Sequence, residues 1–246
     1  MQIKFFGLLQ DSWNFIRNQL QFTLFGVGLL VLLQIGALFL LQNLVVLPLE
    51  PNARDIGAEV EVSSLLPSIL LAMINVFVNA VLILNIKSIN NGNYRNFFQN
   101  IVPALSVLPA MLLFMMLMFF PIAFAFVGTM TAGTNGGMSS LIMLPVLITG
   151  VLVLIKLSII SYVYLTEEPR KSVMETLKFT WGISRGKGNM LLLYFAVSYV
   201  APFILSGFIG GLGTIVSVII GSFINFFITI FGFRFYQVFR TIPAKL

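Results

Sequence analysis

Long apolar runs dominate the chain, and short polar segments separate them. The six runs cover about residues 20–47, 65–86, 101–128, 141–165, 190–208 and 214–232. A helix needs about 20 apolar residues to cross a hydrocarbon layer of about 30 Å. The pattern therefore predicts an all-α fold, a polytopic transmembrane helical bundle with six spans.

The polar segments between these runs are too short to fold by themselves. None exceeds about two dozen residues, which cannot supply an independent hydrophobic core. Composition agrees, since 59% of the residues are hydrophobic and 9% are charged, whereas roughly a quarter of a soluble domain is charged. We therefore expect residues 1–246 to form a single integral-membrane domain.

Basic residues gather on one side of the predicted spans. Twelve of the fourteen Lys and Arg residues lie before the first span, between spans two and three, between spans four and five, or after the sixth. Of the other two, Arg54 lies in the acidic first loop, residues 48–64, and Lys156 lies within the fourth span. Because segments rich in Lys and Arg stay in the cytosol, this asymmetry predicts that the N-terminus and the C-terminus are both cytosolic.

Residues 166–189 form a charged island between the fourth and fifth spans, with five basic and three acidic residues. Val173, Leu177 and Trp181 recur at helical spacing, and the charged residues stay off that stripe. This pattern predicts a cytosolic interfacial amphipathic helix that meets anionic lipid, with Trp181 as its anchor.

The start of this helix is marked by Ser172 and Glu175, whose spacing fits a capping box. Basic and aromatic residues beside the spans are the candidates for anchoring the chain at the membrane interface. The predicted anchors are Trp13, Arg17, Lys171, Lys178, Trp181, Arg185, Arg234 and Arg240.

The island has a counterpart near the start of the chain. Residues 8–17, LLQDSWNFIR, align without gaps on residues 176–185, TLKFTWGISR, and bring together the two tryptophans of the sequence. A looser version, YRNFFQNIVPALSVLP, precedes the third span with phenylalanines in place of tryptophan. The similarity predicts an internal repeat, with a possible three-fold repeat of an interfacial helix plus a two-span hairpin.

Three segments together resemble the YciC family, uncharacterised multi-pass inner-membrane proteins of Gram-negative bacteria. They are DSWNFIRNQ at 11–19, LKFTWGISR at 177–185 and FRFYQVFR at 233–240. The resemblance covers essentially the full chain and implies a cell inner membrane location, about six helices and no established activity. It carries over no functional residues, and the first loop is shorter than the resemblance implies.

The residue types argue against catalysis. The sequence has no His and no Cys, which removes imidazole bases, thiolate nucleophiles and most zinc or haem ligation. All eight acids lie outside the predicted spans, which disfavours proton- or sodium-coupled transport through a carboxylate in the membrane. We therefore predict no enzyme and no cofactor, and the scattered basic residues do not form the stripe typical of nucleic-acid binding.

Lys156 is the one charged residue within a predicted span. It precedes the cytosolic end by about nine residues, roughly 13 Å at the helical rise, so its long stem can extend toward the interface. An intramembrane cation is a candidate ligand site. The position of Lys156 favours snorkelling or a structural partner over that alternative.

Uncharged polar residues also lie within the spans. Asn75 and Asn79 share a helix face, and Asn225 lies in the sixth span. Hydrogen bonds between helices are favoured for all three, because a polar path would need several of them on one cavity. The GxxxG spacing of Gly207 and Gly211 predicts close packing of spans five and six.

Two classes of function lead at this point, and a membrane-bound enzyme ranks third. The favoured one is a non-catalytic inner-membrane protein that binds membrane lipids or an unidentified protein partner. The alternative is a transporter or channel for a lipid or other amphiphile, between kinked spans three and five. A channel needs a continuous polar cavity and a lipid handler needs a lateral apolar groove, whereas a scaffold needs neither.

Overall fold

The computed structural model describes residues 4–44, 62–132 and 138–243, and over these ranges the regular structure is helical throughout. Six helical stretches are long and apolar enough to cross a membrane: Leu20–Phe39, Ile69–Asn90, Phe97–Gly128, Met143–Thr166, Gly188–Leu212 and Thr214–Phe239. The predicted all-α bundle of six long apolar helices is therefore confirmed. Most of the acidic first loop, Arg54 included, lies outside the described residues.

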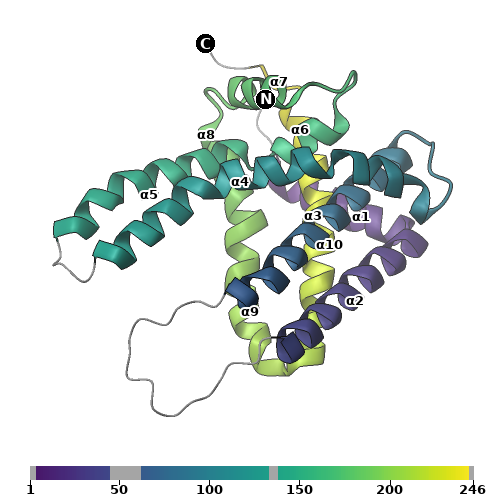
Figure 1. Ribbon diagram of the computed structural model, residues 1–246. Helices are drawn as coiled ribbons and strands as arrows, with labels where there is room; N and C mark the ends of the chain where they lie inside the picture. The colour runs from purple at the N-terminus through teal and green to yellow at the C-terminus, as the bar shows by residue number, and fades with distance from the viewer. Residues whose placement is uncertain (1–3, 45–61, 133–137, 244–246) are drawn as a thin grey trace.

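Figure 1 shows how these elements are arranged. In chain order they are α1 (Phe5–Asn18), α2 (Leu20–Leu44), α3 (Val62–Asn90), η1 (Phe97–Asn100), α4 (Ile101–Ala132), α5 (Met138–Leu157), α6 (Ile160–Thr166), α7 (Val173–Ile183), α8 (Gly188–Phe195), η2 (Ala196–Val200), α9 (Ala201–Ile209), η3 (Gly210–Leu212) and α10 (Thr214–Phe239). Helix α7 and the C-terminal end of α10 lie at the top of that view, and turn η3 and the far end of α2 lie at the bottom.

Two of the spans are interrupted. Between α5 and α6 the helix breaks at Ser158 and Ile159, and the Ser158 hydroxyl donates to the Ile155 carbonyl at 2.8 Å. Between α8 and α9 the backbone widens into the π-helical turn η2. Pro202 follows that turn and has no N–H to offer the carbonyl of Ser198, which accounts for an interruption at this place.

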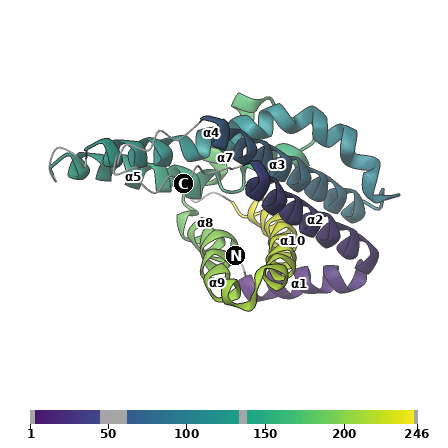
Figure 2. The same cartoon turned by 60° about the horizontal axis from the view of Figure 1, so that its bottom comes forward.

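Helix α10 lies at the centre of the packing, between α2 on one side and α9 on the other, as Figure 2 shows. On the α2 side, Phe22 and Phe226 are buried with their ring centroids 5.4 Å apart. Gly26 permits this contact, because a Cβ atom there would overlap the Phe226 ring. Toward its C-terminal end, α10 stacks Phe235 on Tyr194 of α8 at 4.4 Å.

The hairpin of α4 and α5 projects away from the other helices in both ribbon views. The two helices approach closely where Gly150 faces Pro121 and Ile122. Beyond that crossing the hairpin exposes large apolar side chains, among them Phe120 and Phe124. Exposed apolar surface of this kind suits contact with lipid chains, as expected of a span within a bilayer.

The end of α10 and the element of the middle repeat unit differ from the sequence prediction. Helix α10 continues to Phe239 instead of ending near residue 232, so Arg234 lies inside the helix and not in an exit segment. The middle repeat unit has one 3₁₀ turn, η1, where the first and third units have the amphipathic helices α1 and α7. The first and third units are therefore more alike than either is to the second.

Candidate functional site

A cavity of about 340 Å³ lies where the two interrupted spans meet α3, α4 and α10. It is near the middle of α3, α4 and α10, and its wall includes Ser158 beside the α5–α6 break and Ser198 in the π-helical turn. Irregular backbone at membrane depth is tolerated where it lines a cavity. Both interruptions of the bundle are therefore placed at the same hollow.

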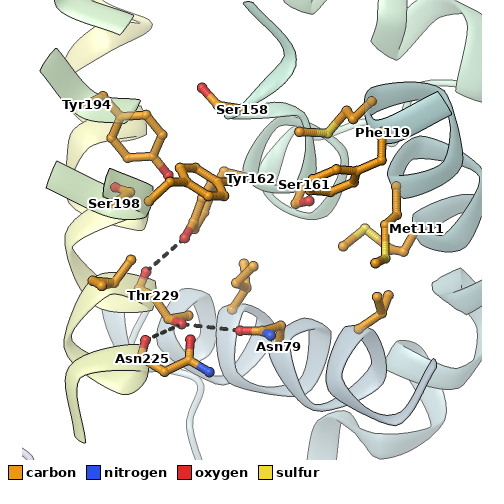
Figure 3. Close-up of a pocket in the computed structure, with 16 residues that line it drawn as sticks. Asn79, Met111, Phe119, Ser158, Ser161, Tyr162, Tyr194, Ser198, Asn225 and Thr229 are labelled. Atoms are coloured by element: carbon orange, nitrogen blue, oxygen red, sulfur yellow. Dashed lines mark hydrogen bonds between the residues drawn. The ribbon is translucent and has the colours of Figure 1, made fainter. Parts of the chain in front are cut away.

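Hydrogen bonds join three elements on the polar side of this cavity, as Figure 3 shows. The hydroxyl of Thr229 on α10 lies 3.3 Å from the side-chain oxygen of Asn79 on α3 and 2.9 Å from the carbonyl of Asn225. The Tyr162 hydroxyl on α6 donates to the Thr229 carbonyl at 3.4 Å. Helices α3, α6 and α10 are thus linked by uncharged polar groups inside the bundle.

Ser198 is the least satisfied of the polar residues at this cavity. Its side chain is 7% exposed, and its hydroxyl has no hydrogen-bond partner in the described part of the chain. Figure 3 places it beside Tyr162 and Tyr194. A buried polar group without a full hydrogen bond costs about 1–3 kcal/mol, and this hydroxyl approaches that of Tyr194.

The wall opposite these groups is made of α4 side chains. Met111, Met115, Met118 and Phe119 line it. Methionine is unbranched and polarisable, so a methionine wall adapts to ligands of different shape. The cavity therefore combines a polar face on α3, α6 and α10 with an adaptable apolar face on α4.

Two further hollows run along α9 and α10 and share wall residues with the cavity. The first, of about 280 Å³, shares Ser198, Asn225 and Ile228 with it. The second is an apolar groove of about 310 Å³, which shares Ile228 and is bounded by Trp13 of α1. The surface thus changes from polar inside the bundle to apolar along the α9–α10 hairpin.

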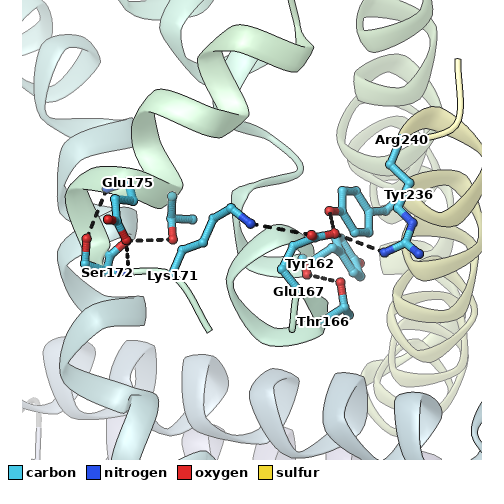
Figure 4. A network of polar contacts seen from close by, with 9 residues as sticks. Tyr162, Thr166, Glu167, Lys171, Ser172, Glu175, Tyr236 and Arg240 are labelled. Atoms are coloured by element: carbon cyan, nitrogen blue, oxygen red, sulfur yellow. Dashed lines mark hydrogen bonds and ion pairs between the residues drawn. The ribbon is translucent and has the colours of Figure 1, made fainter. Parts of the chain in front are cut away.

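A charged network fastens the end of α6 to α10, as Figure 4 shows. Glu167 accepts a hydrogen bond from the Tyr236 hydroxyl, pairs with Arg240 at 3.0 Å and lies 3.6 Å from the Lys171 ammonium. Partial burial alone would raise the pKa of Glu167, but the Tyr236 hydrogen bond and the Arg240 and Lys171 charges outweigh it and hold the pKa below its ordinary value of 4.5. The carboxylate is therefore ionised at neutral pH and serves as a structural tie.

The predicted interface anchors divide into two groups. Lys171 and Arg240 pair with Glu167, and the half-buried Arg234 donates to Asn90 and Gln237. The remaining basic anchors, on α1, α7 and the turn after α7, are exposed: Arg17, Lys178 and Arg185. The first group joins parts of the protein to one another, and the second lies on the surface of the described chain.

Helix α7 begins as predicted, with a capping box between Ser172 and Glu175. Its fully buried residues, however, are Thr176 and Thr180, while Trp181 is 37% exposed. Trp181 covers the ammonium of Lys156, which lies 4.1 Å from the centroid of its ring. Lys156 therefore has a structural partner at the end of α5 and does not line the cavity.

The two aligned segments have similar burial but different neighbours. Ser12 and Thr180 are both fully buried at the aligned position, and the tryptophan that follows each is exposed. Trp13, however, packs edge-on against Phe223 of α10 with ring centroids 6.3 Å apart. Its ring therefore bounds the α9–α10 groove, whereas the ring of Trp181 covers a lysine.

The three predicted asparagines are used differently. Asn79 and Asn225 both line the cavity, and Asn79 is bonded across helices to Thr229. Asn75 is exposed and donates to the Leu71 carbonyl of its own helix at 3.0 Å. The expectation of an interhelical bond therefore does not describe Asn75.

The GxxxG prediction for the fifth and sixth spans is wrong. A Cβ atom at Gly207 or Gly211 would meet nothing within 4 Å, so these glycines do not lie in a close helix contact. The hairpin is joined by Ser217, whose hydroxyl donates to the Ile209 carbonyl at 2.8 Å. Small residues allow close packing, but they do so only where a partner faces them.

Sequence reasoning missed Lys187, whose side chain is 5% exposed. Its ammonium donates to the Phe239 carbonyl at 3.2 Å and to the carbonyl of Ile242, at the C-terminal end of α10. Carbonyls at a helix end need outside donors, but Lys187 lies 52 residues from Phe239 in the chain, so no local pattern links it to that end. Pro202 was a usable signal for the irregular turn, because it leaves the backbone carbonyl of Ser198 without its helical donor.

A comparison with curated proteins finds one distant relative of unknown role. An uncharacterized protein of Haemophilus influenzae is 25% identical over 249 residues, which are 97% of this chain and 99% of the relative. No protein-family model matches the chain, and no solved structure matches it. The apolar helices show a multi-pass membrane protein, and any further statement about its role has to come from the site.

Proposed function

We propose that the protein binds an amphiphile, a lipid or lipid-like molecule, in the cavity between α3, α4, α6 and α10. The observation that carries this proposal is that both interrupted spans line that one cavity near the middle of the bundle. π-Helical turns occur frequently at functional sites, and membrane proteins that bind solutes often do so between broken helices at this depth.

The two-sided lining favours an amphiphile over an ion. Hydroxyl and amide groups form one face, methionines form the other, and an apolar groove adjoins through Ile228. An ion channel needs a continuous polar path, and a scaffold has no use for a cavity. The site needs no catalysis, in keeping with a sequence that has no His and no Cys.

The proposed setting is the cell inner membrane, with the α7 end of the bundle in the cytosol. The positive-inside asymmetry of the sequence supports this orientation, as do the exposed Lys178 and Arg185 near α7, which suit anionic lipid. A relationship to the YciC-like proteins remains part of the proposal and rests on the motifs near Trp13 and Trp181. Binding to a protein partner has no specific site to support it.

The test fills the cavity and measures retained lipid. Met115→Trp places an indole in the cavity wall, whereas Met116→Trp adds the same bulk at a neighbouring side chain that is 69% exposed. Native mass spectrometry of the purified protein should show several-fold less co-purified lipid for Met115→Trp and unchanged lipid for Met116→Trp. Equal retention by both variants, with equal thermal stability, would refute binding in this cavity.

A further inference from the structure

We propose that the bound amphiphile is neutral, with an uncharged hydroxyl-bearing head group at Ser198 and Asn225 and an acyl chain along the α9–α10 groove. This inference rests on the proposed function and narrows it to one class of ligand. It also assigns a direction to the molecule, with the head inside the bundle and the chain toward the surface.

The lining of the cavity selects against charge. Among the described residues that form its wall, the polar ones are hydroxyl and amide side chains, and none is Lys, Arg, Asp or Glu. The intramembrane ammonium of Lys156 is engaged by the Trp181 ring instead. An isolated phosphate or carboxylate in such surroundings would be strongly disfavoured, whereas a hydroxyl or ester finds partners of its own kind.

Ser198 supplies the specific contact. Its side chain is more than nine-tenths buried, and its hydroxyl makes no close hydrogen bond in the described chain beyond an approach to the Tyr194 hydroxyl. A hydroxyl offers one donor and two acceptor positions, so it can both receive from and donate to a head-group alcohol. Asn225 borders the same space and the adjoining hollow, and Figure 3 shows it on the polar side with Thr229.

The volume indicates where the rest of the ligand goes. A cavity of about 340 Å³ is near the lower end of the range for small-molecule pockets, about 300–1,000 Å³. A long acyl chain cannot fit with its head group in that space. The apolar groove lies beside the cavity, with Ile228 in the walls of both, and is lined by Leu205, Phe223, Phe227 and Trp13; we assign the chain to this groove.

The experiment uses the full chain in phosphatidylcholine nanodiscs with two photoactivatable probes. One is a diacylglycerol with a diazirine in its acyl chain, and the other is the phosphatidic acid with identical chains, so the probes differ in the phosphate alone. After irradiation, mass spectrometry maps the labelled peptides. We expect the diacylglycerol probe to label the α9 and α10 groove residues about tenfold more than phosphatidic acid does.

Ser198→Ala tests the head-group contact. Loss of one hydrogen bond corresponds to about a tenfold loss of affinity, so groove labelling by diacylglycerol should fall by about that factor. Ser106→Ala is the matched control, because that hydroxyl is exposed on α4 and bonds to the Pro103 carbonyl of its own helix. The melting temperature of lipid-stripped Ser198→Ala should stay close to that of the lipid-stripped wild type, since only the contact with the Tyr194 hydroxyl is lost.

The outcomes separate this inference from the proposed function. Groove labelling by phosphatidic acid that equals or exceeds that by diacylglycerol would overturn the neutral head group and leave amphiphile binding in place. Unchanged diacylglycerol labelling of Ser198→Ala would overturn the placement of the head group. Absence of groove labelling by either probe, together with normal lipid retention by Met115→Trp, would remove the proposed function as well.

Discussion

Helix α10 packs against its two neighbours in opposite ways. On the α2 side, Gly26 admits the Phe226 ring so closely that a Cβ atom would overlap it, and Phe22 fills the remaining space. On the other side, none of the residues of α9 is buried. One contact is filled by aromatic rings, and the other leaves the hollows that adjoin the cavity.

This difference shows that small residues alone do not set how closely helices pack. Both sides of α10 have glycines on the neighbouring helix, but only the α2 side places a large ring against one. The open side costs packing energy, since interiors are otherwise close-packed. These hollows adjoin the cavity that we propose as the amphiphile site.

The largest expected loss of stability comes from adding a side-chain atom to the close contact between α2 and α10. Gly26→Ala should lower the free energy of unfolding by about 3 kcal/mol, the upper part of the range for overpacking, because the Phe226 ring has to move. Gly28→Ala is the control, since its Cβ would meet nothing within 4 Å. Thermal and denaturant unfolding in detergent measure both, and equal behaviour of the two variants would contradict the close contact.

An intermediate effect is expected where α6 is tied to the end of α10. Glu167→Gln should cost about 1.5 kcal/mol at neutral pH, because it weakens charge-assisted bonds to Tyr236 and Arg240. The pKa of Glu167 is lower in the folded protein, so its contribution is complete above its unfolded pKa and is lost as the pH falls through the folded value.

The pH dependence of stability provides the control for the Glu167→Gln variant. The stability difference between the wild type and Glu167→Gln should be constant above about pH 5.5, where the carboxyl group is ionised in both states, and should shrink as the pH falls below 4.5. Glu168 also has a lowered pKa, because it accepts a hydrogen bond from Lys87 and pairs with it. Glu168 is present in both proteins, so its contribution to the stability difference cancels. A stability difference that stays the same in acid would argue against the ion pair between Glu167 and Arg240.

The smallest effect is expected on the open side of α10. Gly207→Ala should leave stability unchanged or raise it by up to about 1 kcal/mol, because alanine is the better helix former and its Cβ meets nothing within 4 Å. Unfolding measured as for Gly26→Ala gives a direct contrast between the two sides. A loss of 1 kcal/mol or more at Gly207 would restore the GxxxG interpretation.

The features that depend on a local pattern of residues could be predicted from the sequence. Six apolar runs predicted six long helices, and the spacing of Ser172 and Glu175 predicted the capping box at the start of α7. Each of these depends on residues close together in the chain. Helix length, apolar content and cap chemistry are therefore visible before any tertiary contact is known.

The site could not be predicted in the same way, because it is formed by residues from distant segments of the chain that meet only in the folded protein. Asn75 and Asn79 are identical residues on one helix face, yet only Asn79 meets Thr229 from α10. The break at Ser158 has no proline or glycine beside it in the sequence. Its place opposite the π-helical turn follows from the packing of distant segments, which a one-dimensional pattern does not contain.

Helix α6 connects the interior of the bundle with its surface. It has seven residues and carries Tyr162, which donates to the Thr229 carbonyl at the cavity. The residue that follows the helix, Glu167, is tied to Arg240. A helix this short keeps its shape when it moves, because its backbone hydrogen bonds fix the positions of its two ends relative to each other. A shift of the α6 backbone at the cavity would therefore also change the distance between Glu167 and Arg240, which links the interior of the bundle to its charged end.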